Sequence, residues 1–440
     1  MGDTKFTTHQ GLRDRRAEFM RTAGQAVERV LDSKRSVLHH IGRLDQAMKL
    51  AEKGLELAIA QGSSEKRAKN LSYMGSIHLD RGNYDQALEH FQKALEIRRE
   101  TGTATDQASS LNSIGIVFDE QGDSDRALAN YQEALSLFEG AGELKGQATA
   151  LNNIGLVKLS RGDHIQALSY FARAADLLGE LRNRTGLAAS RHNMGNIYRG
   201  LGDYRRALEN YQSSLDITNK VGDRRGQANN LISIGAACNE RGEYKEAIGH
   251  YRKSLAIRRE IGDRRGEAYS LVNLGESLIG SEDYQGALEV LEASLAIQQK
   301  LGFKALLCAT MCDLAEAKIR LEKLAEAEAD LRKGMDAARE NGSASDEALC
   351  HEAYGLFYSC LGEYRRAEAH YEKATDHHRG AGKKYSLARS LLDRGLMHLA
   401  AGEHASATEN LRQAEALFRE MGLEFWAGKA RQASGKGMVG

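Results

Sequence analysis

Residues 222–235 read GDRRGQANNLISIG, and residues 262–275, forty positions later, read GDRRGEAYSLVNLG. Eight of these fourteen positions are identical. Self-similarity at a fixed period is typical of repeat proteins, in which each unit stacks on its neighbours. The two segments therefore predict an array with a period of forty residues, in which GDRRG is either a ligand-binding motif or the turn between units.

The period extends over most of the chain. No insertion or deletion breaks the register from about residue 63 to residue 422, and every fortieth residue from Ala87 to Ala407 is alanine. A small residue recurs at Gly75, Gly115, Gly155, Gly195, Gly235, Gly275, Ala315, Gly355 and Gly395. An aromatic residue or leucine follows sixteen positions later, at Phe91, Tyr131, Phe171, Tyr211, Tyr251, Leu291, Leu331, Tyr371 and Leu411.

The spacing of apolar residues in each forty-residue repeat predicts two amphipathic helices of about 15 residues. In residues 223–262, apolar residues spaced by three and four mark a first helix that ends at Gly242 and a second that ends at Gly262. Glycine accepts the left-handed conformation that commonly terminates a helix. One such pair cannot bury its apolar faces alone, but a stack of pairs can. The pattern therefore predicts an all-α fold.

N-cap residues support these boundaries, because their side chains accept hydrogen bonds from the first free N–H groups of a helix. They precede the second helices at Asn83, Asp123, Asp163, Asp203 and Asp283, and the first helices at Ser63, Thr103, Asp223, Asp263 and Ser343. GDRRG is accordingly interpreted as a helix stop followed by a helix start.

Composition agrees with a helical, folded chain. The 440 residues contain no proline, a residue that breaks helix interiors, and their hydrophobic fraction is 41%. The 61 basic residues balance the 61 acidic ones, so nucleic acid is not an expected partner. No apolar run is long enough for a membrane span, and the N-terminus lacks the apolar segment of a signal peptide. Five cysteines without a disulfide pattern favour a reducing, cytoplasmic location.

The columns of small residue, alanine, aromatic residue and again small residue resemble the tetratricopeptide (TPR) signature. The unit of forty is longer than the usual unit of about 34 residues, and its phrasing is similar to the long-repeat arrays of the mitotic adaptor Pins/LGN and of bacterial signalling proteins. The resemblance implies a right-handed superhelix of about nine regular helix pairs, a degenerate first pair and a C-terminal capping helix. The expected boundaries are 1–22 for an N-terminal arm, 23–62 for the degenerate repeat, 63–422 for nine repeats, 423–434 for the capping helix around Trp426, and 435–440 for a tail.

No motif in the chain predicts catalysis or a cofactor. The tail GKGMVG matches GxGxxG but lacks the strand and helix that such a motif requires. Cys308 and Cys312 lie four apart on one helix face and, with Cys350 and His351, resemble a soft metal site. Cys308, however, stands in a column of alanines, where a small buried thiol serves packing, so no metal site is expected. We expect a protein that is not an enzyme.

Function is expected in the groove, because in TPR arrays the first helices line a concave surface that binds extended peptides or helices. The resemblance implies that Asn153, Asn193 and Asn273 hold the main chain of a ligand. The early part of the predicted groove is polar and the late part apolar, and an exposed apolar stretch usually marks a binding surface. The remaining residues assigned to the groove are Asn112, Asn152, His192, Asn196, Arg199, Asn239, Ile279, Ile319, Leu356 and Leu396.

These observations favour a scaffold that binds a protein or peptide partner between the asparagine-rich and apolar sections. An alternative is a regulatory or sensor module of a larger bacterial signalling protein. A covered apolar groove, hidden by superhelical closure or by a further domain, is the other interpretation of the late section. Self-association through the ends of the array is a further partner interaction that the sequence leaves open.

Overall fold

The computed structural model describes residues 43–437, which form helices joined by short turns and contain no strand. The helices are numbered α2 to α21 and are divided into two compact units, one ending at Arg182 and the other beginning at Asn183. The all-helical prediction is confirmed for this part of the chain. The predicted N-terminal arm and the first helix of the degenerate repeat lie outside the described residues.

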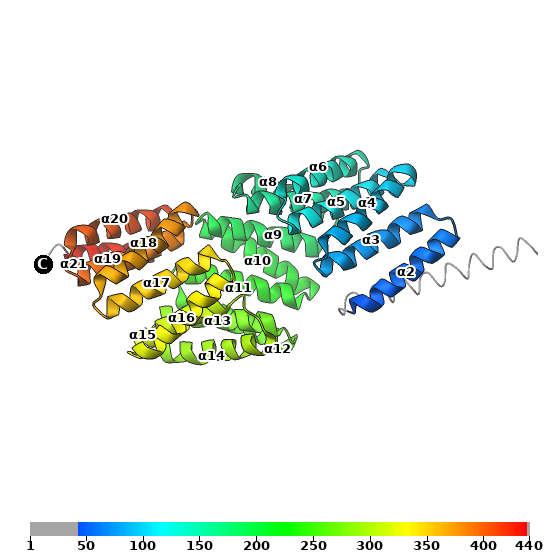
Figure 1. The fold of residues 1–440 in the computed structure, drawn as a ribbon. Helices are drawn as coiled ribbons and strands as arrows, with labels where there is room; N and C mark the ends of the chain where they lie inside the picture. The colour runs from blue at the N-terminus through cyan, green and yellow to red at the C-terminus, as the bar shows by residue number, and fades with distance from the viewer. Residues whose placement is uncertain (1–42, 438–440) are drawn as a thin grey trace, which may run out of the picture. The chain divides into compact units, whose positions relative to one another are not determined.

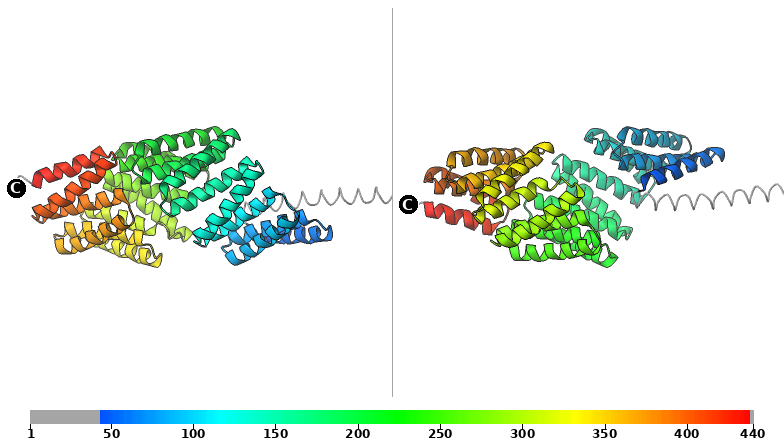
Figure 2. Two further views of the ribbon diagram at one scale, coloured as in Figure 1. Left: turned by 90° about the horizontal axis from the view of Figure 1, so that it is seen from above. Right: turned by 60° about the horizontal axis from the view of Figure 1, so that its bottom comes forward.

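Unit 1 begins with the second helix of the degenerate repeat, which packs on the first regular pair. Three regular helix pairs follow, each joined by a turn of a few residues (Figures 1 and 2). The helices are α2 (Leu44–Ala60), α3 (Ser64–Asp80), α4 (Tyr84–Thr101), α5 (Ala104–Glu120), α6 (Ser124–Gly140), α7 (Leu144–Ser160) and α8 (His164–Glu180).

Unit 2 contains six helix pairs and one final helix (Figure 1). The helices are α9 (Arg184–Gly200), α10 (Tyr204–Val221), α11 (Arg224–Glu240), α12 (Tyr244–Glu260), α13 (Arg264–Gly280), α14 (Tyr284–Leu301), α15 (Leu307–Arg320), α16 (Leu324–Glu340), α17 (Ala344–Cys360), α18 (Tyr364–Gly380), α19 (Lys384–Ala400), α20 (His404–Glu420) and α21 (Glu424–Gly437).

The recurring glycine and the recurring aromatic residue face each other within each pair. A Cβ atom added to Gly235 would lie 2.6 Å from the ring of Tyr251, and one added to Gly155 would lie 3.0 Å from the ring of Phe171. Only glycine therefore lets the second helix place a fully buried ring against the backbone of the first. The one repeat with alanine in this column, at Ala315, has the smaller Leu331 opposite, in the same buried cluster.

The turn residues behave as the sequence predicts. Gly242 and Gly262 are left-handed, with φ of 79° and 69°. Asp263 is the N-cap of the next helix, and its carboxylate accepts a hydrogen bond of 2.9 Å from the backbone N–H of Gly266. GDRRG is thus a helix stop and a helix start. All ten predicted N-cap residues occupy the N-cap position, and Asn83 alone makes no side-chain cap hydrogen bond there.

Helix α15 begins late. It starts at Leu307 and has 14 residues, whereas α11 and α13 start directly after Asp223 and Asp263 and have 17. The equivalent position is Phe303, whose side chain offers no acceptor for the free N–H groups of a first turn. Helix α19 also lacks a side-chain cap and still begins directly after Lys383, so the missing cap does not by itself account for the short non-helical stretch before α15.

Helix α21 caps the array, as predicted, but it also contacts helices far from the last pair. The ring of Trp426 stacks on Phe418 of α20, with centroids 5.9 Å apart. Its Nε1 donates a hydrogen bond of 2.9 Å to the backbone oxygen of Glu240, 186 residues earlier. Phe425 meets Tyr244 edge-on and lies over Gly242. Unit 2 therefore curls until its last helix contacts the turn between α11 and α12.

Alanine substitutions at two glycines should change stability in opposite directions, because only one of the two glycines contacts a ring. Replacing Gly235 by alanine is expected to lower the free energy of unfolding by about 1–3 kcal/mol, because the new methyl group overlaps the Tyr251 ring. Gly249 on α12 has no atom within 4 Å of an added Cβ, so Gly249→Ala is expected to raise stability by up to about 1 kcal/mol through helix propensity. Urea unfolding measures both, and Tyr251→Leu should partly relieve Gly235→Ala.

The closure of unit 2 predicts a large effect at Trp426. Trp426→Ala is expected to lower the free energy of unfolding by about 3–5 kcal/mol, because it removes a 4%-exposed ring and its hydrogen bond. Trp426→Phe keeps most of the packing and should cost about 1 kcal/mol for the lost N–H donor. Hydrogen exchange of residues 237–244 should increase in the alanine variant. Equal losses in the two variants would contradict the closure contact.

Candidate functional site

The first helices of the pairs form one layer in each unit. Successive first helices, such as α13, α15 and α17, pack against one another, whereas successive second helices make few contacts or none. The layer of first helices is therefore the inner side of the curve, where the helices crowd together. This layer contains every residue that the sequence assigns to the groove.

In unit 1, the predicted groove asparagines contact one another. Asn153 of α7 donates a hydrogen bond of 3.0 Å from Nδ2 to Oδ1 of Asn112 on α5. Both side chains and that of Asn152 are half-buried. These amides thus link successive repeats and still reach solvent.

In unit 2, the polar residues of α9 form a second group. His192 Nδ1 and Asn230 Oδ1 are 2.9 Å apart, and the pKa of His192 is lowered because burial disfavours its charged form. Asn196 accepts a hydrogen bond of 2.8 Å from the hydroxyl of Tyr211. Arg199 forms an ion pair of 3.0 Å with Glu240 of the next repeat. Asn193, between them, is half-buried.

Asn239 and Asn273 differ in their access to a ligand. Asn239 is buried, accepts a hydrogen bond from the hydroxyl of Ser277 at 2.7 Å and donates one to Glu276 at 3.0 Å. It therefore joins α11 to α13 and does not face solvent, which corrects its assignment to an open groove. Asn273 is half-buried and donates to the backbone oxygen of Tyr269 at 2.8 Å.

The prediction of an exposed apolar section is wrong for two of the four residues assigned to it. Ile279 and Ile319 are 9% and 4% exposed and belong to hydrophobic clusters between the helices. Packing of the neighbouring first helices covers them. Leu356 is half-buried, and Leu396 is 44% exposed. The apolar surface left in this section is therefore small.

The structure also brings together a group of carboxylates from the columns of predicted groove residues: Glu276 and Glu316 lie in the column of Asn196, and Asp313 and Asp393 lie in that of Asn273. They lie on the first helices of unit 2 and interact electrostatically with one another across repeats. All of them keep some exposure to solvent. We call this group the acidic inner surface, and its members are Glu240, Glu276, Asp313, Glu316 and Asp393.

Four of these carboxyl groups have raised pKa values. Desolvation is the largest cause at Glu240, Glu276 and Asp313, and repulsion by neighbouring carboxylates adds to it at Glu276 and Asp313. Desolvation also raises the pKa of Asp393 to about 6, although the positive charge of Arg389 opposes the shift. A carboxyl group that is largely surrounded by protein has a raised pKa, because its charged form loses contact with water.

Arg389 links the acidic inner surface to the closure of unit 2. Its guanidinium lies 4.0 Å from the ring centroid of Trp426 and interacts with Asp393 and Glu316. Cation–π contact with a largely buried tryptophan holds the charge in place. Helix α21, which closes unit 2, thus also positions the guanidinium of Arg389 among the carboxylates.

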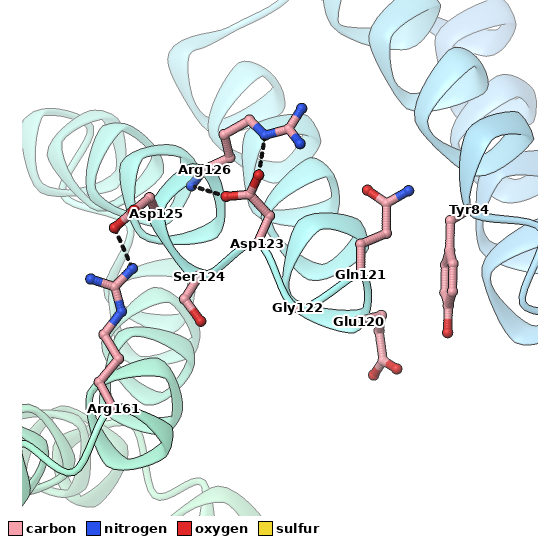
Figure 3. Close-up of a pocket in the computed structure, with 9 residues that line it drawn as sticks. All are labelled: Tyr84, Glu120, Gln121, Gly122, Asp123, Ser124, Asp125, Arg126 and Arg161. Atoms are coloured by element: carbon pink, nitrogen blue, oxygen red, sulfur yellow. Dashed lines mark hydrogen bonds and ion pairs between the residues drawn. The ribbon is translucent and has the colours of Figure 1, made fainter. Parts of the chain in front are cut away.

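An open hollow of about 970 Å³ lies in unit 1 (Figure 3). It is bordered by Tyr84, by residues 120–126 at the turn between α5 and α6, and by Arg161. Both of its arginines are already paired, since Arg126 contacts Asp123 at 2.5 Å and Arg161 contacts Asp125 at 2.6 Å. The hollow is therefore a poorer candidate for a charged ligand than the acidic inner surface.

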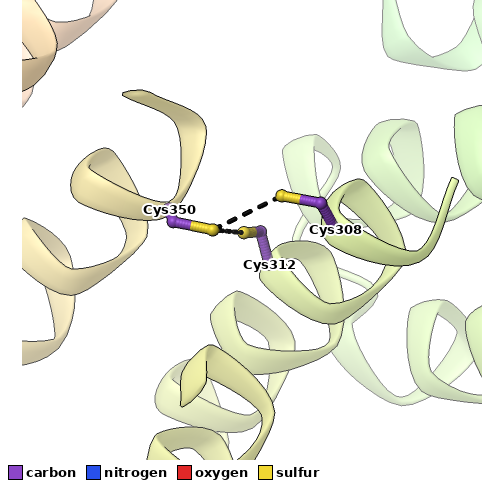
Figure 4. Close-up of side chains that lie close together, drawn as sticks. All are labelled: Cys308, Cys312 and Cys350. Atoms are coloured by element: carbon purple, nitrogen blue, oxygen red, sulfur yellow. Dashed lines mark hydrogen bonds between the residues drawn. The ribbon is translucent and has the colours of Figure 1, made fainter. Parts of the chain in front are cut away.

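One cluster in the described part of the chain could hold a metal ion. The sulfur atoms of Cys308, Cys312 and Cys350 all lie within 4.8 Å of one another, and the three residues are buried (Figure 4). His351, which the sequence placed near them, instead contacts His370, with the two Nδ1 atoms 2.9 Å apart.

Within residues 43–437, none of the helices combines the length and the apolar character needed to cross a membrane.

Comparison with known proteins gives one matching family model, described as tetratricopeptide repeat. It matches residues 66–140, 146–220, 186–260, 225–300, 266–340 and 346–420. None of the curated proteins compared with the chain matches it significantly.

Several solved structures have a similar fold. A Rap protein in complex with Competence and Sporulation Factor is 14% identical, with a TM-score of 0.59 over 89% of this chain and 98% of that one. The apo form of RapI is 16% identical, with a TM-score of 0.51 over 62% of this chain and 98% of that one. BtubC (BKLC) from P. vanneervenii is 19% identical and covers 50% of this chain and 92% of its own, with a TM-score of 0.46.

The raised pKa of Asp393 predicts a pH-dependent stability difference. Its folded pKa of about 6 exceeds the ordinary value of 3.8, so its contribution to stability is present below about pH 4 and is lost as the pH rises through 6. Asp393→Asn should therefore raise the free energy of unfolding at pH 7.5 by about 1–3 kcal/mol and have little effect at pH 4. Urea unfolding at both pH values measures this.

A matched control is Asp336→Asn, at an exposed position of the second helix α16. This variant should change the free energy of unfolding by less than about 0.5 kcal/mol at either pH. An Asp393→Asn variant that is less stable than the wild type at pH 7.5 would contradict the assigned environment.

Proposed function

Because the chain belongs to the tetratricopeptide repeat family, we propose that it is a non-enzymatic scaffold that binds a partner peptide on the inner layer of unit 2. The observation that carries this proposal is the convergence of the acidic inner surface from several repeats. Grouped carboxylates with raised pKa values lower the stability of the folded state at neutral pH. Their presence is therefore explained by a function other than folding. Binding of a positively charged segment would offset that loss of stability.

Two groups on the inner layer suit an extended peptide. The half-buried amides of Asn193 and Asn273 each offer a donor and an acceptor, the combination that a peptide backbone requires. The carboxylates of Glu276 and Glu316 would then pair with lysine or arginine side chains of the peptide. The ligand class that we propose is therefore a basic peptide or a basic segment of a partner protein.

The asparagines of unit 1 are proposed as a second, uncharged contact region. Asn112, Asn152 and Asn153 keep part of their surface exposed and offer amide donors and acceptors to the backbone of a partner. A Rap protein of similar fold has been solved in complex with Competence and Sporulation Factor.

A regulatory module of a larger signalling protein is the second candidate. Closure of unit 2 by α21 favours it, because a ligand among the carboxylates would displace Arg389 and so act on Trp426 and the last helix. The complete reading frame distinguishes the two functions, since the regulatory module predicts a catalytic or DNA-binding domain elsewhere in the gene.

The binding prediction can be tested without knowing the partner. A random peptide library displayed on phage is selected against the full chain, and the selected peptides are measured by isothermal titration calorimetry. We expect enrichment of lysine and arginine, and an affinity at least tenfold lower for Glu276→Gln/Glu316→Gln, because the variant loses two partners of the cationic side chains. Asn193→Ala/Asn273→Ala should also weaken binding.

The control is Glu289→Gln/Glu292→Gln, which removes the same number of charges from exposed positions on the second helix α14. Its affinity should equal that of the wild type. Selection of acidic or uncharged peptides, or equal affinity in both glutamine variants, would refute the acidic inner surface as the binding site.

A further inference from the structure

Three cysteines meet where two first helices of unit 2 pack together (Figure 4). Cys308 and Cys312 lie one turn apart on α15, and Cys350 lies on α17. The sulfur of Cys350 is 3.4 Å from that of Cys308 and 3.6 Å from that of Cys312. The three side chains are at most 3% exposed.

Packing does not require cysteine at these positions. The column of Cys308 holds alanine in the eight other repeats, from Ala68 to Ala388. The column of Cys350 holds serine four times, for example at Ser270 and Ser390. Three cysteines from three different columns therefore coincide at a single junction, which a need for small side chains does not explain.

The same junction has a different polar contact in other repeats. The positions equivalent to Cys312 and Cys350 are occupied by His192 and Asn230 in one repeat pair, with a contact of 2.9 Å. In another pair they are Glu352 and Ser390, which share a short hydrogen bond. The junction thus places one side chain of each repeat against the next, and here it does so with sulfur atoms.

The structure leaves room beside the sulfur atoms. Gly334 stands in a column that otherwise holds alanine or serine. A Cβ atom at Gly334 would lie 3.6 Å from the sulfur of Cys312, so its absence widens the space there.

We propose that Cys308, Cys312 and Cys350 form a buried site for a soft, monovalent metal ion of the Cu(I) type, bound by three sulfur atoms. An ion in a plane at about 2.3 Å from each of three sulfurs holds them about 4.0 Å apart. The observed separations of 3.4 Å and 3.6 Å, with the third below 4.8 Å, approach this arrangement. Thiolates select soft ions, and the cluster contains no histidine or carboxylate to complete a tetrahedral zinc site.

Binding involves no oxidation or reduction. Each cysteine that becomes a ligand loses its thiol proton to solvent, and the metal keeps its charge. The ion would connect α15 to α17 and so tie together two repeats at the point where α15 lacks its first turn. This proposal is independent of the peptide-binding function, since the cysteines are buried.

The test is an anaerobic titration of the full chain with Cu(I), using bathocuproine disulfonate as a coloured competitor. We expect one Cu(I) per chain and a higher unfolding temperature in the loaded protein. X-ray absorption should show three sulfur neighbours. Two sulfur neighbours, or an oxygen or nitrogen neighbour, would overturn the three-sulfur site.

The chain itself supplies the variants. Cys308→Ala/Cys312→Val/Cys350→Ser introduces residues that other repeats hold at the same positions, so it should fold and bind Cu(I) at least 100-fold more weakly. Cys238→Ala/Cys360→Ser leaves the cluster intact and should bind as the wild type does. Unchanged binding in the triple variant would overturn the proposal, and so would a disulfide among the three cysteines in protein purified without reductant.

Discussion

The approach of a glycine to a buried ring sets the distance between the two helices of a pair, and the remaining architecture depends on that distance. Gly235 and Tyr251 show the contact, and the same two columns carry it in most repeats. Leucine replaces the ring at Leu291, Leu331 and Leu411, and the repeat of Leu331 also has Ala315 in place of the glycine. Pairs of nearly constant thickness can then stack with a constant period.

Constant packing in these columns leaves other positions of the first helices free to vary. The junction between successive first helices holds an imidazole and an amide at His192 and Asn230, and a carboxylate and a hydroxyl at Glu352 and Ser390. These contacts lie beside the conserved packing and do not alter it. A repeat protein can therefore change the chemistry of one junction without disturbing the next, because each unit contacts mainly its neighbours.

Sequence alone predicts the features that recur with the period. The helix pairs, the left-handed Gly242 and Gly262, and the N-cap of Asp263 follow from residue types at fixed positions. The late start of α15 could not be predicted, because the register is unbroken there and α19 begins in register after Lys383 without a side-chain cap.

Features that depend on the curl of unit 2 could not be predicted from the columns. Trp426 contacts Glu240 across 186 residues, a separation that is no multiple of forty. Exposure was misjudged for a different, local reason, because Ile279 and Ile319 occupy groove columns but are covered by the adjacent first helices. Column patterns describe one repeat and its neighbour, whereas the curvature of unit 2 brings together residues from repeats far apart in the sequence.

The acidic inner surface follows from that curvature and explains why function should be sought there. Spread along a straight array, Glu276, Glu316 and Asp393 would be ordinary solvated acids, which contribute little to stability. In unit 2 they interact with one another, and desolvation raises the pKa of Glu276 and Asp393. Replacing such residues by neutral ones of similar size stabilises a fold that has no other use for them. Their presence around Arg389, in a unit closed by its last helix, is therefore better explained by a ligand than by folding.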